Sequence, residues 1–143
     1  MKLPAKVEYA AKAVLELSIR YQAQMPIQIS TIAKSQNIPH NFLLQLLIRL
    51  KNAGIVTSSR GVSGGYYLAK DPTRISLADV VGAIDDAILE APKRSKGRKS
   101  SDSSEVMTQV WSDINIEVIK RLKEATFDKL AAKVKNEQLT YQI

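Results

Sequence analysis

The sequence predicts a mainly α-helical fold with one small β-hairpin, and three observations predict it. Apolar residues recur at three- and four-residue spacing through most of the 143-residue chain, which is the period of helices that pack on a core. Two short β-rich runs flank residues 61–65, where three of the six glycines lie. A later helical run, 105–125, keeps an apolar stripe along its length. The length suits one domain, or one domain with a small appendage.

Three helices are predicted before the hairpin. The first spans residues 4–21 and begins with Pro4, which a first helical turn tolerates. The second is short, at 28–37, and it ends before Pro39 because the residue preceding a proline avoids helical backbone. The third begins at His40 and stops at Gly54, since glycine readily takes the left-handed conformation of a helix end. Its apolar stripe is Leu43, Leu46, Leu47 and Leu50.

The pattern then changes from helix to strand. "IVTSS" at 55–59 and "YYLAK" at 66–70 predict the two strands of the hairpin. A helix follows at 76–88, with Ser76 as its N-cap. Residues 91–104 have no apolar period and predict a flexible basic loop. The helix at 105–125 and a short one at 126–136 complete the chain.

The glycine cluster raises the question of phosphate binding. A nucleotide-binding loop needs a strand, glycines, Lys-Ser/Thr and then a helix, whereas "SSRGVSGGYYLAK" is followed by a strand. We therefore interpret Gly61, Gly64 and Gly65 as residues that let a basic hairpin turn tightly and lie close to another surface.

The positive charge lies in the first half of the chain. Residues 1–70 hold nine lysines and arginines against two glutamates, a net charge of +7, whereas residues 71–143 hold twelve charges of each sign. A basic field of this kind favours a polyanionic partner, with nucleic acid first and an anionic membrane surface second.

The composition excludes several kinds of site. The chain has no cysteine and a single histidine, so cysteine-held zinc, cysteine-held iron–sulfur clusters and a Ser-His-Asp triad are not expected. Asp85, Asp86 and Glu90 are interpreted as an exposed helix end, with a hard-metal site as the alternative. No apolar run is long enough to span a membrane and the N-terminus lacks signal-peptide features, so we expect a cytoplasmic protein with no membrane partner. Because the chain has no cysteine, one histidine and no catalytic motif, we expect no cofactor and no enzyme activity.

The order of helix, short helix, turn, helix and basic hairpin predicts a winged helix-turn-helix domain that binds double-stranded DNA. The helix from His40 is then the recognition helix, which lies in the major groove. Asn and Gln side chains there can pair with adenine, and Arg60 at the hairpin tip would enter the minor groove. The DNA-binding residues predicted on these elements are His40, Asn41, Gln45, Arg49, Arg60, Gly61, Ser63, Gly64 and Gly65.

"KxxxYA" at 6–10 and above all "RGxxGGYxL" at 60–68 resemble the family of winged-helix transcriptional regulators that includes IscR, NsrR and CymR. The resemblance continues through "ISLADVVGAID" and "VWSDI". It implies that the late helix pairs with its mate in a dimer, that the wing arginine and the start of the recognition helix contact DNA, and that Lys6 and Tyr9 lie nearer the phosphate backbone. Cluster-binding members carry three cysteines in the loop that matches 91–104, where this chain has "PKRSKGRKSSDSS".

We therefore expect a winged helix-turn-helix domain at 1–72 and a helical dimerisation region at 73–143. The expected function is that of a sequence-specific transcriptional regulator, with repression favoured, which binds an inverted-repeat operator without an iron–sulfur cluster. The alternative is a winged module that docks an acidic protein partner. Regulation by a small molecule or a protein effector is open, as is a contact of the basic residues at 93–99 with flanking DNA. The expected homodimer interface is Met107, Trp111, Ile114, Val118 and Leu122.

Overall fold

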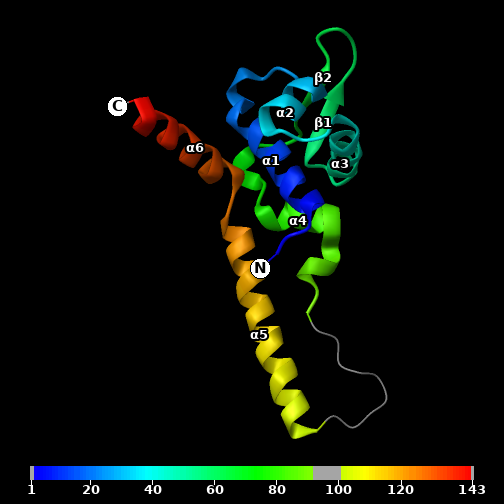
Figure 1. Ribbon diagram of the computed structural model, residues 1–143, viewed down its shortest axis with the longest axis vertical. Coiled ribbons are helices and arrows are strands. Elements are labelled where there is room, and N and C mark those ends of the chain that lie inside the picture. Colours follow the sequence, from blue (N-terminus) through cyan, green and yellow to red (C-terminus); the bar gives the residue numbers. More distant parts are fainter. Residues whose placement is uncertain (1, 92–100, 143) are drawn as a thin grey trace.

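The computed structural model describes residues 2–91 and 101–142, and helix α1, Ala5–Ile19, lies at its centre (Figure 1). Helix α1 contacts α2 (Ile29–Gln36), α3 (His40–Asn52), α4 (Leu77–Asp85) and α6 (Phe127–Gln142). Its inward residues are almost completely buried because their three- and four-residue spacing keeps them on the sides that these helices cover. They are Val7, Ala10, Ala13, Val14 and Leu17.

The hairpin is the predicted wing. Strands β1, Val56–Ser59, and β2, Gly65–Leu68, pair antiparallel with Val56 opposite Leu68. Ile27, just before α2, forms an antiparallel β-bridge with β2. Its backbone N–H donates to the Tyr66 carbonyl at 2.8 Å, and the Tyr66 N–H donates to the Ile27 carbonyl at 2.8 Å. The wing is therefore fastened to the start of the helix-turn-helix.

The predicted element order is confirmed, and so are the N-cap at Ser76 and the left-handed backbone of Gly54, whose φ is +76°. Three boundaries were wrong by three or more residues. Helix α4 ends at Asp85 and a 3-10 turn, Asp86–Leu89, replaces its predicted last turn. Helix α5 begins at Asp102 because Ser101 caps it, so residues 102–104 are helix and not loop. Helix α6 continues to Gln142, six residues beyond its predicted end.

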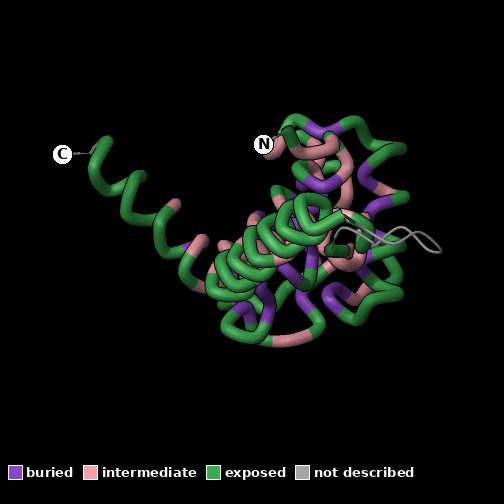
Figure 2. The backbone as a smooth tube through the Cα atoms, turned by 90° about the horizontal axis from the view of Figure 1, so that it is seen from below, coloured by how far each residue is buried: buried purple, intermediate pink, exposed green. Residues whose placement is uncertain are grey.

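Helix α5, Asp102–Glu124, extends away from the winged domain. Figure 2 shows the consequence: buried residues are concentrated in the winged domain, whereas α5 is exposed or half-buried along its whole length. The root of α5 is fixed by backbone hydrogen bonds. The Leu77 N–H donates to the Ala125 carbonyl at 2.9 Å, and the Phe127 N–H donates to the Ile75 carbonyl at 2.9 Å. The Phe127 ring is fully buried.

A buried carboxylate joins the first two helices. Glu16 is 6% exposed, and it accepts hydrogen bonds from Arg20 at 2.8 Å and from the Gln36 amide at 2.9 Å. Both bonds satisfy a charge that would otherwise be costly to bury. The contact with Gln36 therefore sets the end of α2 against α1.

Across residues 2–91 and 101–142, no helix is both long enough and apolar enough to cross a membrane.

Candidate nucleic-acid interface

The outward face of α3 is the centre of the candidate interface. Four of its five leucines are buried, at 0–2% exposure, so the opposite side of the helix must face solvent. Asn41, Gln45, Ile48 and Asn52 recur there at three- and four-residue spacing, and all four are exposed. His40 is the first residue of α3 and is also exposed, as is Arg49 near its end. The predicted recognition-helix residues therefore share one accessible helix.

Helix α1 forms one edge of this face. The Tyr9 ring meets the Phe42 ring edge-on at a centroid distance of 5.7 Å, and the Lys12 ammonium lies 6.0 Å from the Tyr9 ring centre. Aromatic pairs favour this edge-to-face geometry. The contact sets α1 beside the start of α3, with Tyr9 and Lys12 on the same edge.

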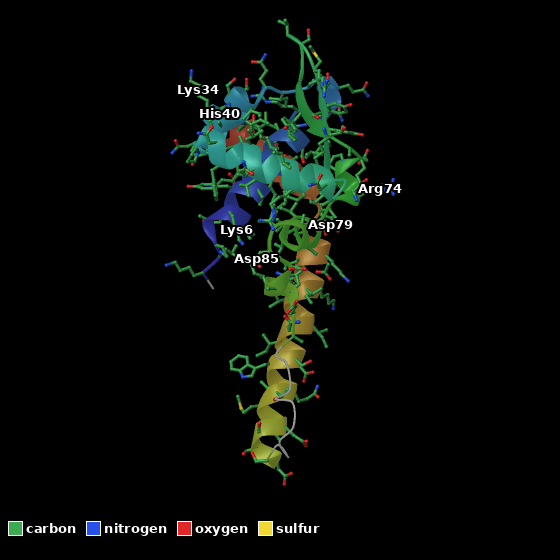
Figure 3. All side chains as sticks on the ribbon, turned by 90° about the vertical axis from the view of Figure 1, so that its right-hand side faces the viewer. Lys6, Lys34, His40, Arg74, Asp79 and Asp85 are labelled. Atoms are coloured by element: carbon green, nitrogen blue, oxygen red, sulfur yellow. The ribbon has the colours of Figure 1, made fainter. Side chains whose placement is uncertain are left out.

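Lys6 has a partner of its own. Its ammonium lies 3.2 Å from the Asp85 carboxylate at the end of α4, and Figure 3 shows the two side chains close together. The same view places Lys6, His40 and Lys34 on one side of the molecule, and Arg74 on the other. Because the pair with Asp85 is partly exposed, its contribution is small, but a phosphate would have to compete with a carboxylate for Lys6.

The wing forms the other edge. Gly61, at φ +103°, starts a tight turn in which the Gly64 N–H donates to the Gly61 carbonyl at 2.9 Å. A Cβ on Gly65 would collide with the backbone of Ile27, so glycine is required where the wing crosses the chain before α2. Arg60 and Ser63 are exposed at the tip, whereas Gly64 is buried within the turn.

One contact sets the wing against α3. The Lys51 ammonium donates to the Ser58 hydroxyl at 2.6 Å, from the last turn of α3 to strand β1. At the tip, the Gln28 amide donates to the Val62 carbonyl at 3.3 Å. The α3 face thus lies between two edges, α1 on one side and the wing on the other.

The structure brings most of the predicted residues onto this candidate interface: Tyr9, His40, Asn41, Gln45, Arg49, Arg60, Gly61 and Ser63. Gly64 and Gly65 shape the wing, and Lys6 lies at the far end of the α1 edge, beside Asp85. The sequence analysis missed Lys12 and Lys34. Lys12 could have been found, because Lys6, Tyr9 and Lys12 follow one another at three-residue spacing on one helix. The basic residues predicted at 93–99 lie outside the described residues.

A second candidate surface is the apolar face of α5. Met107 is 49% exposed, Trp111 is 53% exposed and Ile114 is 47% exposed. Val118 and Leu122, predicted on the same stripe, are half-buried and line an open groove of about 620 Å³ with Leu77 of α4. The predicted stripe therefore divides into an exposed outer part and an inner part that is partly covered by its own chain. Val106 and Val110, which were not predicted, extend the exposed part.

Comparison with known proteins shows that this chain is similar to transcriptional regulators. Residues 3–133 match the Rrf2 family, described as an iron-dependent transcriptional regulator. The candidate HTH-type transcriptional regulator slr0846 of Synechocystis sp. is 35% identical over 130 residues, which cover 91% of this chain and 87% of the relative. IscR of Vibrio vulnificus, an HTH-type transcriptional regulator, is 31% identical over 91% of this chain and 77% of its own.

Solved structures show the same fold. CymR, the global cysteine regulator of B. subtilis, superposes with a TM-score of 0.79 at 27% identity, covering 93% of this chain and 98% of CymR. IscR of T. potens gives a TM-score of 0.76 at 27% identity and covers 93% of this chain and 88% of that one. The chain is therefore a member of the Rrf2 family of transcriptional regulators, which are not enzymes.

Proposed function

We propose that this protein binds double-stranded DNA as a homodimer, at an inverted-repeat operator, and acts there as a repressor. Helix α3 would enter the major groove with Asn41 and Gln45 toward base edges, and Arg60 would enter the adjacent minor groove. Repression is the favoured mode because occupation of a promoter by the dimer is sufficient for it.

The single observation that carries this proposal is the arrangement around α3. An exposed helix face with three amides lies between the α1 edge and the glycine-built wing, and the contacts Tyr9–Phe42 and Lys51–Ser58 hold both edges to it. The half of the chain that builds this arrangement carries the whole net charge of +7. A reading element flanked by two phosphate-facing edges is what DNA recognition requires.

The apolar face of α5 supports the homodimer. Apolar residues along an exposed helix are stabilised when a second helix covers them, and a symmetric pair covers the same residues on both protomers. Two winged domains related by a two-fold axis then require a DNA site with the same symmetry.

The family description implies iron, and the residues of this chain do not fit a thiolate-held iron site. Iron–sulfur clusters are bound through cysteine thiolates, and the chain has no cysteine. Within the described residues, no three His, Asp or Glu side chains gather as metal ligands. We therefore propose that DNA binding needs no cluster and that regulation comes from a small-molecule or protein effector.

Selection from a random duplex pool tests the proposed function. At physiological salt with excess competitor DNA, we expect enrichment of an inverted repeat whose half-site centres lie about 10 base pairs, or a multiple, apart. Gln45→Ala should change the enriched sequence, whereas Gln138→Ala on α6, also an exposed amide, should leave it unchanged. Failure to enrich any sequence, together with tight binding to an acidic polypeptide, would instead support docking of an acidic partner.

A further inference from the structure

The outward face of α3 contains one exposed aliphatic residue among amides. Ile48 is 42% exposed and lies between Gln45 and Asn52, three and four residues away on the same face, with Asn41 one turn before Gln45. Single exposed apolar residues are common on protein surfaces. The position of this one, at the centre of the face that the two edges enclose, makes it informative.

The described residues, 2–91 and 101–142, do not account for the exposure of Ile48. It lies on the side of α3 opposite the four buried leucines. Phe42, which is 40% exposed, is partly explained by its contact with Tyr9. Helix α5 leaves the winged domain away from α3 (Figure 1), so a dimer formed through α5 would not cover Ile48. The surface that would cover it is the DNA that α3 reads.

Base edges in the major groove offer one apolar group, the 5-methyl of thymine, and apolar side chains recognise it by contact. Amide side chains recognise adenine by a pair of hydrogen bonds. Three amides and one isoleucine on one face are therefore complementary to A·T pairs, with adenine opposite an amide and a thymine methyl opposite Ile48. Guanine is instead read mainly by Arg or Lys, and among the described residues no cation stands at the centre of this face.

We propose that Ile48 is a specificity-determining residue that contacts the 5-methyl group of a thymine in each operator half-site. This inference rests on the proposed function, and it adds the chemistry of the recognised base. It also assigns a base contact to the ninth residue of α3, deeper along the helix than His40 and Asn41.

The test uses the duplex that the wild-type protein enriches from the random pool, resynthesised with deoxyuridine in place of one thymine at a time. Deoxyuridine keeps every hydrogen-bonding group of thymine and lacks only the methyl. We expect one thymine per half-site at which the replacement weakens wild-type binding roughly fourfold, the effect of losing one buried methyl. The Ile48→Ala variant should bind the thymine and deoxyuridine duplexes alike, and Ile48→Val should retain part of the difference.

Controls separate this contact from general effects. Ile116→Ala on α5, which removes an isoleucine of 59% exposure, should keep the full wild-type response to deoxyuridine. Thermal unfolding of Ile48→Ala should match the wild type, because the side chain lies outside the core. If the wild type binds its selected duplex but no deoxyuridine position depends on Ile48, the methyl contact is wrong and the proposed function stands. If no duplex is enriched at all, the proposed function fails and this inference fails with it.

Discussion

The winged domain and helix α5 differ in how far their apolar side chains are buried. In the winged domain, apolar residues from α1, α3, the wing and α4 meet in one core, where Leu43, Leu47 and Ile75 are fully buried. Along α5, none of the 23 residues is buried, and Met107, Trp111 and Ile114 are about half exposed. The charges differ too, since the excess of +7 lies entirely in residues 1–70.

The difference indicates which kind of partner each region needs. The winged domain has an enclosed core, which α4 and the Phe127 ring complete, so its exposed charge and amides are free for a ligand. The exposed stripe on α5 consists of apolar residues that no second helix covers within the described chain, and a second copy of α5 would cover them. We therefore expect mutations in the first region to affect folding and DNA binding, and mutations in the second to affect assembly.

The largest effect is expected from a cavity in the winged core. Leu47→Ala removes a fully buried side chain and should lower the free energy of unfolding by about 2–5 kcal/mol. Ile116→Ala on α5 is the matched exposed control, and it should change the free energy by less than about 0.5 kcal/mol. Urea denaturation measures both. Similar losses from the two variants would break the contrast between the regions.

A charge on the α5 stripe should separate assembly from folding. Ile114→Asp should weaken dimerisation by roughly 2–4 kcal/mol, the range of central interface residues, because a carboxylate would be buried in each half of the seam. Circular dichroism should show a folded chain. Sedimentation velocity over a concentration series measures the effect, with Ile116→Asp on another side of α5 as the control. Unchanged assembly of Ile114→Asp would remove this stripe from the interface.

The two edges of the candidate DNA interface should respond differently. Arg60→Ala should weaken binding to the selected duplex by about 1–3 kcal/mol, most when the flanks are rich in A·T pairs. Lys12→Ala should weaken all duplexes alike and reduce the slope of log affinity against log salt by about 0.9. Lys6→Ala should behave like Lys12→Ala with a smaller change, since Asp85 already offsets its charge. Fluorescence anisotropy with specific and random duplexes distinguishes these outcomes, and equal losses for Arg60→Ala on both would confine the wing to backbone contacts.

Helix caps offer a smaller comparison. Ser76 and Asp79 form a reciprocal capping box at the buried start of α4, so Ser76→Ala should cost about 1 kcal/mol of global stability. Ser101 caps α5 at its exposed end. Ser101→Ala should only fray the first turn there, with faster amide exchange and little change in the urea midpoint. A global loss from Ser101→Ala would show that α5 is part of the same cooperative unit.

The smallest expected effect is that of iron removal. Because the chain has no cysteine to hold a cluster, anaerobically purified protein should be colourless, and an iron chelator should leave its DNA affinity unchanged. Absorption spectra and iron and sulfide analysis check this. Stoichiometric iron and sulfide, lost together with a change in affinity, would contradict it.

The fold could be predicted from sequence because its signals are local. The leucine period of α3, the stop at Gly54 and the cap at Ser76 each depend on a few neighbouring residues, and the structure confirms all three. One of the boundaries that failed depends on a contact between residues far apart in sequence. The 3-10 turn after α4 is held in part by the Asn115 amide, which donates to the Leu89 carbonyl at 3.2 Å from 26 residues away.

The candidate site could be predicted only in part, for the same reason. Asn41, Gln45 and Arg60 follow from the position of α3 and of the wing. The pairing of Lys6 with Asp85 and the ring contact of Tyr9 with Phe42 join residues far apart in sequence, so no local pattern predicts them. The partial covering of Val118 and Leu122 likewise depends on Leu77 of α4.

The central claim is that two winged domains, joined through α5, read one inverted repeat, and the mass of the protein–DNA complex tests it most directly. Sedimentation equilibrium of the selected duplex with saturating protein should give two chains of 15.8 kDa per duplex, with no stable complex of one chain. A duplex containing a single half-site should bind at least tenfold more weakly. One chain per duplex, with equal affinity for the single half-site and the full repeat, would contradict the account.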